Sequence, residues 1–190
     1  MSDILAAHIR RFVGFTTEEA AMLNNYASTL VVKKKSLLLQ EGQVCRHNYF
    51  VEKGCLRMFF TDEKGAEQTN QFAIENWWMT DYGSYTNGSP SQFYIQAVEH
   101  SSILAFSKST ERELFTALPV LDQYFRRILE KSFGATQWRI RYIFSQSKEE
   151  RYWHFCSLYP DFIQRIPQYM LASYLGLTPE YVSEIRKKKS

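Results

Sequence analysis

The segment covering residues 165–187 constrains the fold of this chain more than any other stretch. Leu171, Ala172 and Leu175 recur at helical spacing and predict a helix with one apolar face. Gly176 follows directly, and a glycine just past a helix end adopts the left-handed conformation without a steric penalty. We therefore expect a helix that stops at this glycine and a chain that turns sharply there.

A second helix is predicted to begin immediately after the turn. Thr178 is a good N-cap and Pro179 suits the first helical position. Leu177 closes the corner, while Val182 and Ile185, three residues apart, face inward. The opposite side of this helix is polar and carries Glu180, Ser183, Glu184 and Lys187.

This pattern resembles the helix-turn-helix of bacterial repressors and activators. Seven positions agree with it: Leu171, Ala172, Leu175, Gly176, Leu177, Val182 and Ile185. The resemblance implies that the second helix reads double-stranded DNA. The residues expected to contact DNA are Gln168, Tyr169, Thr178, Pro179, Glu180, Ser183, Glu184, Arg186, Lys187 and Lys188. The alternative is a helical hairpin that packs on its own domain.

The charge distribution favours DNA binding. Residues 162–190 contain five basic and two acidic side chains, a net charge of +3, which equals the formal charge of the whole chain. Residues 1–161 are therefore balanced, and the excess positive charge lies at one end. Such an excess is expected of a module that contacts phosphates.

The whole-chain composition indicates an ordinary globular protein. The 190 residues are 45% hydrophobic, which is enough for a true core. The N-terminus lacks a secretory signal, and no apolar run approaches the roughly 20 residues of a membrane helix, so we expect a cytoplasmic protein with no membrane partner. Three widely spaced cysteines, Cys45, Cys55 and Cys156, indicate neither a disulfide framework nor a zinc site.

Within the first hundred residues, the pattern of apolar residues changes near residue 31. Spaced apolar groups in residues 2–30 predict short helices, with Thr17 as the cap of one of them. Residues 31–106 form short runs rich in Val, Tyr, Phe, Ile and Thr with glycine turns between them, which predicts an antiparallel β domain. Within this domain, two runs flanking residues 61–67 predict a hairpin.

A long helix is predicted over residues 120–144, after a short one over 109–118. It carries two apolar stripes, one formed by Leu121, Phe125, Ile128 and Ala135 and the other by Leu129, Phe133, Ile140 and Ile143. One stripe can cover the β domain, and the other needs a partner, most simply the same helix of a second copy. The alternative is a helix buried on both sides within one subunit.

These elements predict an α+β protein: an antiparallel, jelly-roll-like β roll, a long dimerisation helix and a C-terminal helical domain. The expected domains are a sensor domain over residues 1–119, a dimerisation helix and hinge over 120–147, and a helix-turn-helix domain over 148–190. The hinge is placed at residues 145–148, which are small and polar.

This order of parts resembles the Crp/Fnr family of bacterial transcription regulators. Residues 37–67 are similar to the first half of that family's cyclic-nucleotide-binding roll, with Gly42, Tyr49, Gly54 and Gly65 at turn or packing positions. The C-terminal sequence IPQYMLASYLGLTPEYVSEIRKK is especially similar to members from the Bacteroidetes lineage. The resemblance implies a homodimeric regulator of transcription rather than an enzyme.

The chain departs from the family where nucleotide-binding members hold their ligand. Those members have a Gly-Glu pair and an Arg-Ser pair, whereas this chain has Thr80-Asp81 and Ser91-Gln92. Neither Ser91 nor Gln92 supplies a cation for a cyclic phosphate, so any small-molecule effector is expected to be something other than cyclic AMP. The absence of cysteine before Cys45 gives no support for an iron–sulfur sensor, and no cofactor is indicated. The candidate effector pocket comprises Trp78, Thr80, Asp81, Ser91, Gln92 and Trp138.

Two other classes of function stay open at this point. One is a cupin-like β-roll metal enzyme, for which His47 supplies one imidazole and Glu52 a nearby carboxylate, although cupins need a His-x-His pair. The other is a ligand-sensing or interaction module that does not bind DNA.

Overall fold

Within residues 3–188, which the computed structural model describes, eight strands form two four-stranded sheets. The strands are β1 (Ala27–Val32), β2 (Leu37–Leu39), β3 (His47–Lys53), β4 (Leu56–Thr61), β5 (Glu67–Ala73), β6 (Trp78–Met79), β7 (Tyr94–Ala97) and β8 (Ser101–Ser107). The strand order is β1-β8-β3-β6 in one sheet and β2-β7-β4-β5 in the other.

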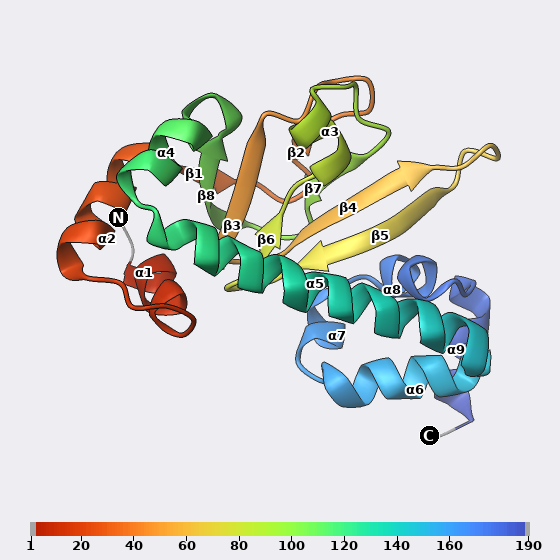
Figure 1. Cartoon of the computed structure of the whole chain (residues 1–190). Coiled ribbons are helices and arrows are strands. Elements are labelled where there is room, and N and C mark those ends of the chain that lie inside the picture. Colours follow the sequence, from red (N-terminus) through yellow and green to blue (C-terminus); the bar gives the residue numbers. More distant parts are fainter. Residues whose placement is uncertain (1–2, 189–190) are drawn as a thin grey trace. The chain divides into compact units, whose positions relative to one another are not determined.

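Helices precede, interrupt and follow these strands (Figure 1). They are α1 (Asp3–Arg10), α2 (Thr17–Leu23), α3 (Tyr82–Asn87), α4 (Glu111–Ala117), α5 (Val120–Ser145), α6 (Lys148–Leu158), α7 (Phe162–Arg165), α8 (Gln168–Leu175) and α9 (Pro179–Lys187), with 3-10 turns η1 (Asn24–Tyr26) and η2 (Lys108–Thr110). The predicted fold class is confirmed: an antiparallel β roll is followed by a long helix and C-terminal helices.

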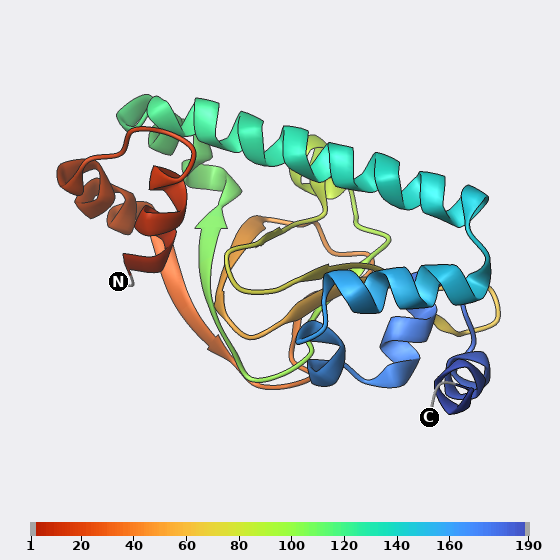
Figure 2. The same cartoon turned by 90° about the horizontal axis from the view of Figure 1, so that it is seen from below.

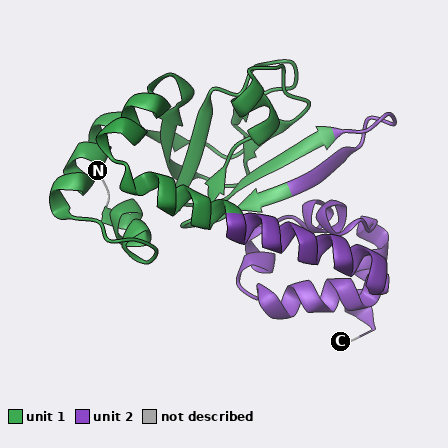
Figure 3. Ribbon diagram, in the orientation of Figure 1, with its two compact units in different colours: residues 1–60, 71–129 green, residues 61–70, 130–190 purple. Residues whose placement is uncertain are grey.

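The described residues form two compact units (Figure 3). Unit 1 comprises residues 3–60 and 71–129, which include most of the β roll, the N-terminal helices and the first part of α5. Unit 2 comprises residues 130–188 together with residues 61–70, which form the tip of the β4–β5 hairpin.

The space between the two sheets of unit 1 is filled by inward-facing apolar side chains. Met58 of β4 pairs in register with Ile95 of β7, and both point into this core. Val51 of β3 pairs in register with Ile103 of β8, and both are fully buried in the same core. Burying an aliphatic side chain of this size contributes about 1.5–3 kcal/mol, so this layer is what holds the sheets together.

A second core lies between helices α1, α2, α4 and α5 and the other face of the β1-β8-β3-β6 sheet. Figures 1 and 2 show α1, α2 and α4 gathered near β1 and β8. Leu121 and Tyr124 of α5 are buried in this core, and Phe125 and Ile128 pack against it. Three of the four residues of the predicted first stripe, Leu121, Phe125 and Ile128, therefore cover the β domain, whereas Ala135 is exposed and belongs to unit 2.

Helix α2 is capped one residue earlier than the sequence suggested. Thr16, not Thr17, accepts a hydrogen bond from the Glu19 amide at 3.1 Å, and its own amide donates to the Glu19 carboxylate at 2.7 Å. Thr16 places a glutamate at the third helical position, whereas Thr17 would place Ala20 there, and the reciprocal capping box needs the carboxylate. Strand β1 also begins earlier, at Ala27.

Unit 2 contains the remainder of α5 and the C-terminal helices. Gln146 and Ser147 separate α5 from α6, and Ser147 caps α6 by accepting from the Glu150 amide. Helix α6 then runs back beside α5 (Figures 1 and 2). The rings of Tyr142 on α5 and His154 on α6 are 4.6 Å apart. Among the described residues, no helix combines the length and the apolar character that crossing a membrane requires.

We predict that Gly54→Ala strongly destabilises the roll. Gly54 has φ +102°, and a Cβ there would lie 2.3 Å from Ser101 Oγ and 2.8 Å from Ser101 Cα. Strain and overlap together should lower the free energy of unfolding by roughly 2–5 kcal/mol, measured by urea denaturation.

The matched control is Gly65→Ala. Gly65 also has positive φ, +81°, but a Cβ there would meet no atom of the described residues within 4 Å. It should cost only about 1–2 kcal/mol, the penalty of the left-handed backbone. Equal losses for the two variants would show that contact with Ser101 does not determine the cost.

Candidate nucleic-acid interface and effector site

The turn between α8 and α9 forms as the sequence predicts. Gly176 has φ +68° and ends α8, and Leu177 is buried after it. The Thr178 hydroxyl accepts from the Tyr181 amide at 3.2 Å, which satisfies one of the free amides at the start of α9. Pro179 occupies the first helical position, where its missing N–H costs nothing.

The inward faces of both helices are apolar and closely packed. Leu171 and Ala172 of α8, and Val182 and Ile185 of α9, are each at most 1% exposed. A residue as small as Ala172 at this contact allows the two helices to approach closely. Four of the five predicted inward positions are therefore buried, and the fifth, Leu175, is only half-buried.

A polar network also joins α8 to α9, and sequence reasoning missed it. The Gln168 side-chain amide donates to Ser183 Oγ at 2.7 Å and to the Pro179 carbonyl at 2.9 Å. Ser183 in turn donates to the same carbonyl at 3.0 Å. Both side chains were predicted to contact DNA, but here they hold the first turn of α9 to the start of α8.

Arg186 likewise contacts its own unit. Its Nε donates to the hydroxyl of Tyr152 on α6 at 2.6 Å, and one terminal nitrogen lies 3.4 Å from Gln168 Oε1. Tyr152 is buried, and burial raises the pKa of its hydroxyl, so the phenol stays neutral and accepts this bond. The sequence offered one signal for this contact, since a tyrosine in an apolar helix face needs a hydrogen-bond partner when it is buried. The sequence did not indicate that Arg186 would be that partner.

The remaining residues predicted to contact DNA have exposed side chains. On α9 and just beyond it, the acidic and basic members lie at helical spacing on the outward face, and Tyr169 of α8 is 48% exposed. These exposed residues are Tyr169, Thr178, Pro179, Glu180, Glu184, Lys187 and Lys188. Lys189, which belongs to the same basic run, lies outside the described residues.

In unit 1, the residues that would face a cyclic nucleotide bind one another. One oxygen of the Asp81 carboxylate accepts from the Gly83 and Ser84 amides at 3.0 and 3.3 Å, which caps α3. The other oxygen accepts from Ser91 Oγ at 2.7 Å. The Thr80 hydroxyl donates to the His47 carbonyl at 2.9 Å. The three buried side chains of the two motifs, Thr80, Asp81 and Ser91, therefore all have hydrogen-bond partners within unit 1.

At these motif positions no side chain carries a positive charge for the phosphate of a cyclic nucleotide. The carboxylate that would receive a ribose hydroxyl already accepts three hydrogen bonds, and the position for a phosphate-binding arginine holds Ser91, while Gln92 is exposed. Lys108 lies over the ring of Tyr85 on α3 but forms an ion pair with Glu111. A phosphate placed here would have to compete for a cation that is already paired.

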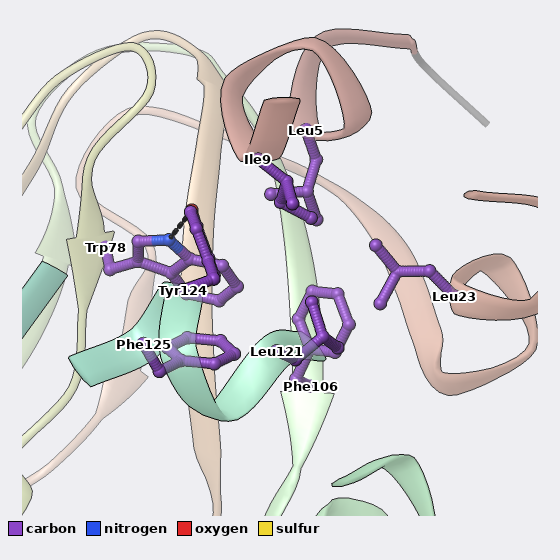
Figure 4. Close-up of a pocket in the computed structure, with 8 residues that line it drawn as sticks. All are labelled: Leu5, Ile9, Leu23, Trp78, Phe106, Leu121, Tyr124 and Phe125. Atoms are coloured by element: carbon purple, nitrogen blue, oxygen red, sulfur yellow. Dashed lines mark hydrogen bonds between the residues drawn. The ribbon is translucent and has the colours of Figure 1, made fainter. Parts of the chain in front are cut away.

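The two tryptophans of the predicted effector pocket belong to different units. Trp78 is part of the helix-facing core of unit 1, in a recess lined by apolar side chains (Figure 4). Its indole donates to the Tyr124 hydroxyl at 2.8 Å, and the recess has no room for a water molecule. Trp138 belongs to unit 2, is 53% exposed and stacks on Tyr142.

The residues considered for a metal site serve structural contacts. The His47 ring stacks on Tyr49, and the Glu52 carboxylate accepts from Ser102 Oγ at 3.0 Å. Across residues 3–188, no three His, Cys, Asp or Glu side chains come together as a metal site would require.

Comparisons with known proteins support the β-roll fold of the sensor region. Residues 29–117 match the family model of the cyclic nucleotide-binding domain. Among curated protein sequences, none matches the chain.

Solved structures are similar over nearly the whole chain. The c-di-GMP-responsive global regulator CLP of Xanthomonas campestris is 12% identical with a TM-score of 0.75, and the match covers 91% of each chain. The catabolite activator protein of Thermus thermophilus is 20% identical with a TM-score of 0.59, covering 93% of this chain and 84% of that one. A transcriptional regulator of the Crp/Fnr family from Eubacterium rectale is 15% identical with a TM-score of 0.68, covering 92% and 83%. The chain therefore contains a cyclic nucleotide-binding domain and has the fold of Crp/Fnr-type transcription regulators.

Proposed function

We propose that this chain is a sequence-specific DNA-binding transcription regulator of the Crp/Fnr type that acts as a homodimer. Helices α8 and α9 form its helix-turn-helix, and α9 enters the major groove of double-stranded DNA. The observation that carries this proposal is the outward face of α9. This face carries exposed acidic and basic side chains, while the other face of α9 is apolar and buried and its first turn is capped. The fold of the chain is that of known regulators.

The proposal extends to the sensor domain. Because Asp81 and Ser91 bind each other, we infer that any effector differs from cyclic AMP in its chemistry. The similarity of the C-terminal sequence to Bacteroidetes regulators stays a prediction. Selection of bound sequences from random duplex DNA, with and without cell extract, tests DNA binding and effector dependence together. A chain that selects no sequence under either condition would contradict the proposed function.

The dimer is proposed from the second apolar stripe of α5. Within this stripe Leu129 is 42% exposed, Phe133 66%, Ile140 51% and Ile143 46%, and Phe144 beside it is 85% exposed. The opposite side of the helix is occupied within unit 2, where Tyr142 contacts His154. A stripe of this length facing water is costly, and the same stripe of a second copy would bury it.

We predict that Phe133→Asp combined with Ile140→Asp gives a monomer in sedimentation experiments at tens of micromolar, roughly the range of ordinary dimer affinities. These positions are preferred over Ile128, which packs against the core of unit 1. Lys131→Asp is the matched control, because Lys131 is exposed on the side of α5 away from the stripe. It should stay dimeric, and a monomeric wild type would refute the dimer.

Lys187 and Arg186 should behave differently when replaced by alanine. Lys187→Ala should weaken binding to all DNA sequences, lower the slope of log affinity against log salt by about one, and change the free energy of unfolding by less than about 0.5 kcal/mol. Arg186→Ala should lower the free energy of unfolding by about 1–3 kcal/mol, because its bond to the Tyr152 hydroxyl is lost. Salt titrations of DNA binding and urea denaturation measure the two effects. Equal stability losses would show that the Arg186 contact is unimportant.

Glu180 and Glu184 are expected to read bases. A carboxylate can accept a hydrogen bond from the amino group of cytosine, so these residues should favour cytosine on the contacted strand. Glu180→Ala should relax the preference at one base pair and cost about 1–3 kcal/mol at the best site relative to non-specific DNA. Glu113→Ala, an exposed glutamate on α4, is the control. If Glu180→Ala and Glu184→Ala both leave the selected sequence unchanged, base reading by these carboxylates is wrong.

A further inference from the structure

The tip of the β4–β5 hairpin, residues 61–70, groups with the C-terminal helices rather than with the rest of the roll. The turn itself is closed by Asp62, whose carboxylate accepts from the Lys64 and Ala66 amides at 3.0 and 2.9 Å. The tip is thus a well-formed local structure. It continues along the chain into β4 and β5.

One side chain of α8 binds the backbone of this tip. Ser173 Oγ accepts from the Thr69 amide at 2.7 Å and donates to the Glu67 carbonyl at 3.0 Å. Strand β5 is at the edge of its sheet, so its outer amides and carbonyls have no neighbouring strand. Ser173 supplies the donor and the acceptor that such a strand would provide.

A second side chain joins the same segments from α5. The Arg139 guanidinium donates to the Asn70 carbonyl and, at 3.0 Å, to the Tyr174 carbonyl in the last turn of α8. It also lies 4.2 Å from the centre of the Tyr174 ring. Carbonyls in the last turn of a helix lack partners within the helix and favour a cation, so this contact is well suited to fix the end of α8.

We propose that Ser173 and Arg139 are positioning residues for DNA binding. Together with the backbone of residues 67–70 they form the α8 clamp, which holds the C-terminal half of α8 in one orientation. This role rests on the proposed function. The clamp acts on α9 through α8, because the Gln168 network ties the start of α8 to the first turn of α9.

The clamp positions α8 without covering the proposed DNA-reading surface. Its contacts use Ser173 and Tyr174, whereas Tyr169, Glu180 and Glu184 remain exposed. Orientation matters in a dimer, since two recognition helices must reach half-sites at a fixed spacing. The clamp therefore sets which half-site spacing the dimer accepts.

Hydrogen exchange tests the clamp itself in the full-length chain. In Ser173→Ala, the Thr69 amide should exchange roughly 3- to 10-fold faster, the range expected for loss of one hydrogen bond. Ser173→Thr keeps the hydroxyl and should restore the protection. Ser157→Ala is the matched control, because Ser157 is exposed and its hydroxyl donates to the His154 carbonyl within α6. An unchanged Thr69 rate in Ser173→Ala would overturn the clamp.

Binding to designed duplexes tests the positioning role. The probes are the sequence that the wild type selects and versions with the half-sites one base pair closer or farther apart. Ser173→Ala and Arg139→Gln should bind the selected spacing roughly 3- to 10-fold more weakly and discriminate less against the altered spacings. A general loss of stability would instead weaken binding to all three duplexes alike.

The outcomes separate this role from the proposed function. If the wild type binds and both variants discriminate between spacings as it does, the positioning role is overturned and DNA binding stands. If the wild type and the Ser157→Ala control select no duplex, the proposed function is overturned and the positioning role falls with it. Restored discrimination in Ser173→Thr supports the clamp directly.

Discussion

The buried hydroxyl of Tyr124 connects three segments that are far apart in the chain. It accepts a hydrogen bond from the Trp78 indole on β6, and His8 Nδ1 on α1 lies 2.8 Å from it. Burial raises the pKa of the Tyr124 hydroxyl above its ordinary value, so the group stays neutral and can pair with His8 Nδ1 in either tautomer of the imidazole. Leaving any of these polar groups unpaired in an apolar core would cost about 1–3 kcal/mol. The three residues therefore depend on one another, and together they fix the first turns of α5 against the sheet and α1.

Because its start is fixed in this way, α5 can serve different purposes along its length. Leu121 and Tyr124 belong to the core of unit 1, whereas Phe133 and Ile140 face outward. Arg139, on another side of the helix, contacts the hairpin tip and α8. A helix with 26 residues and several apolar stripes is explained by these separate roles, since a helix that only covered one sheet face would need a single stripe.

The parts of the structure that depend on nearby residues could be predicted from the sequence, and those that depend on distant residues could not. Gly176, Thr178 and Pro179 set the turn and the start of α9 through contacts within a few residues, so their spacing was informative. The short runs rich in Val, Tyr, Phe, Ile and Thr, with glycine turns between them, likewise indicated the roll. By contrast, Ser173 meets Thr69 across 104 positions and Arg186 meets Tyr152 across 34, and no local pattern selects such pairs. The cap of α2 is an exception to this division, because it depends on nearby residues alone and only the capping box with Glu19 distinguishes Thr16 from the adjacent Thr17.

Under the proposed function, the polar contacts within unit 2 also determine which groups of α9 remain for DNA. Gln168 and Ser183 bind each other, and Arg186 binds Tyr152, which leaves Glu180, Glu184 and Lys187 outward. Carboxylates accept hydrogen bonds but cannot donate them, and they repel phosphates. A DNA sequence without a suitably placed base amino group is therefore disfavoured both by the missing hydrogen bond and by this repulsion. Such a helix gains selectivity at the expense of affinity. In the proposed regulator, the missing affinity comes from lysines that contact phosphates and from two copies bound at once, because linking two weak sites multiplies their binding. The proposed dimer stripe of α5 is then a requirement of the proposed DNA binding rather than an addition to it.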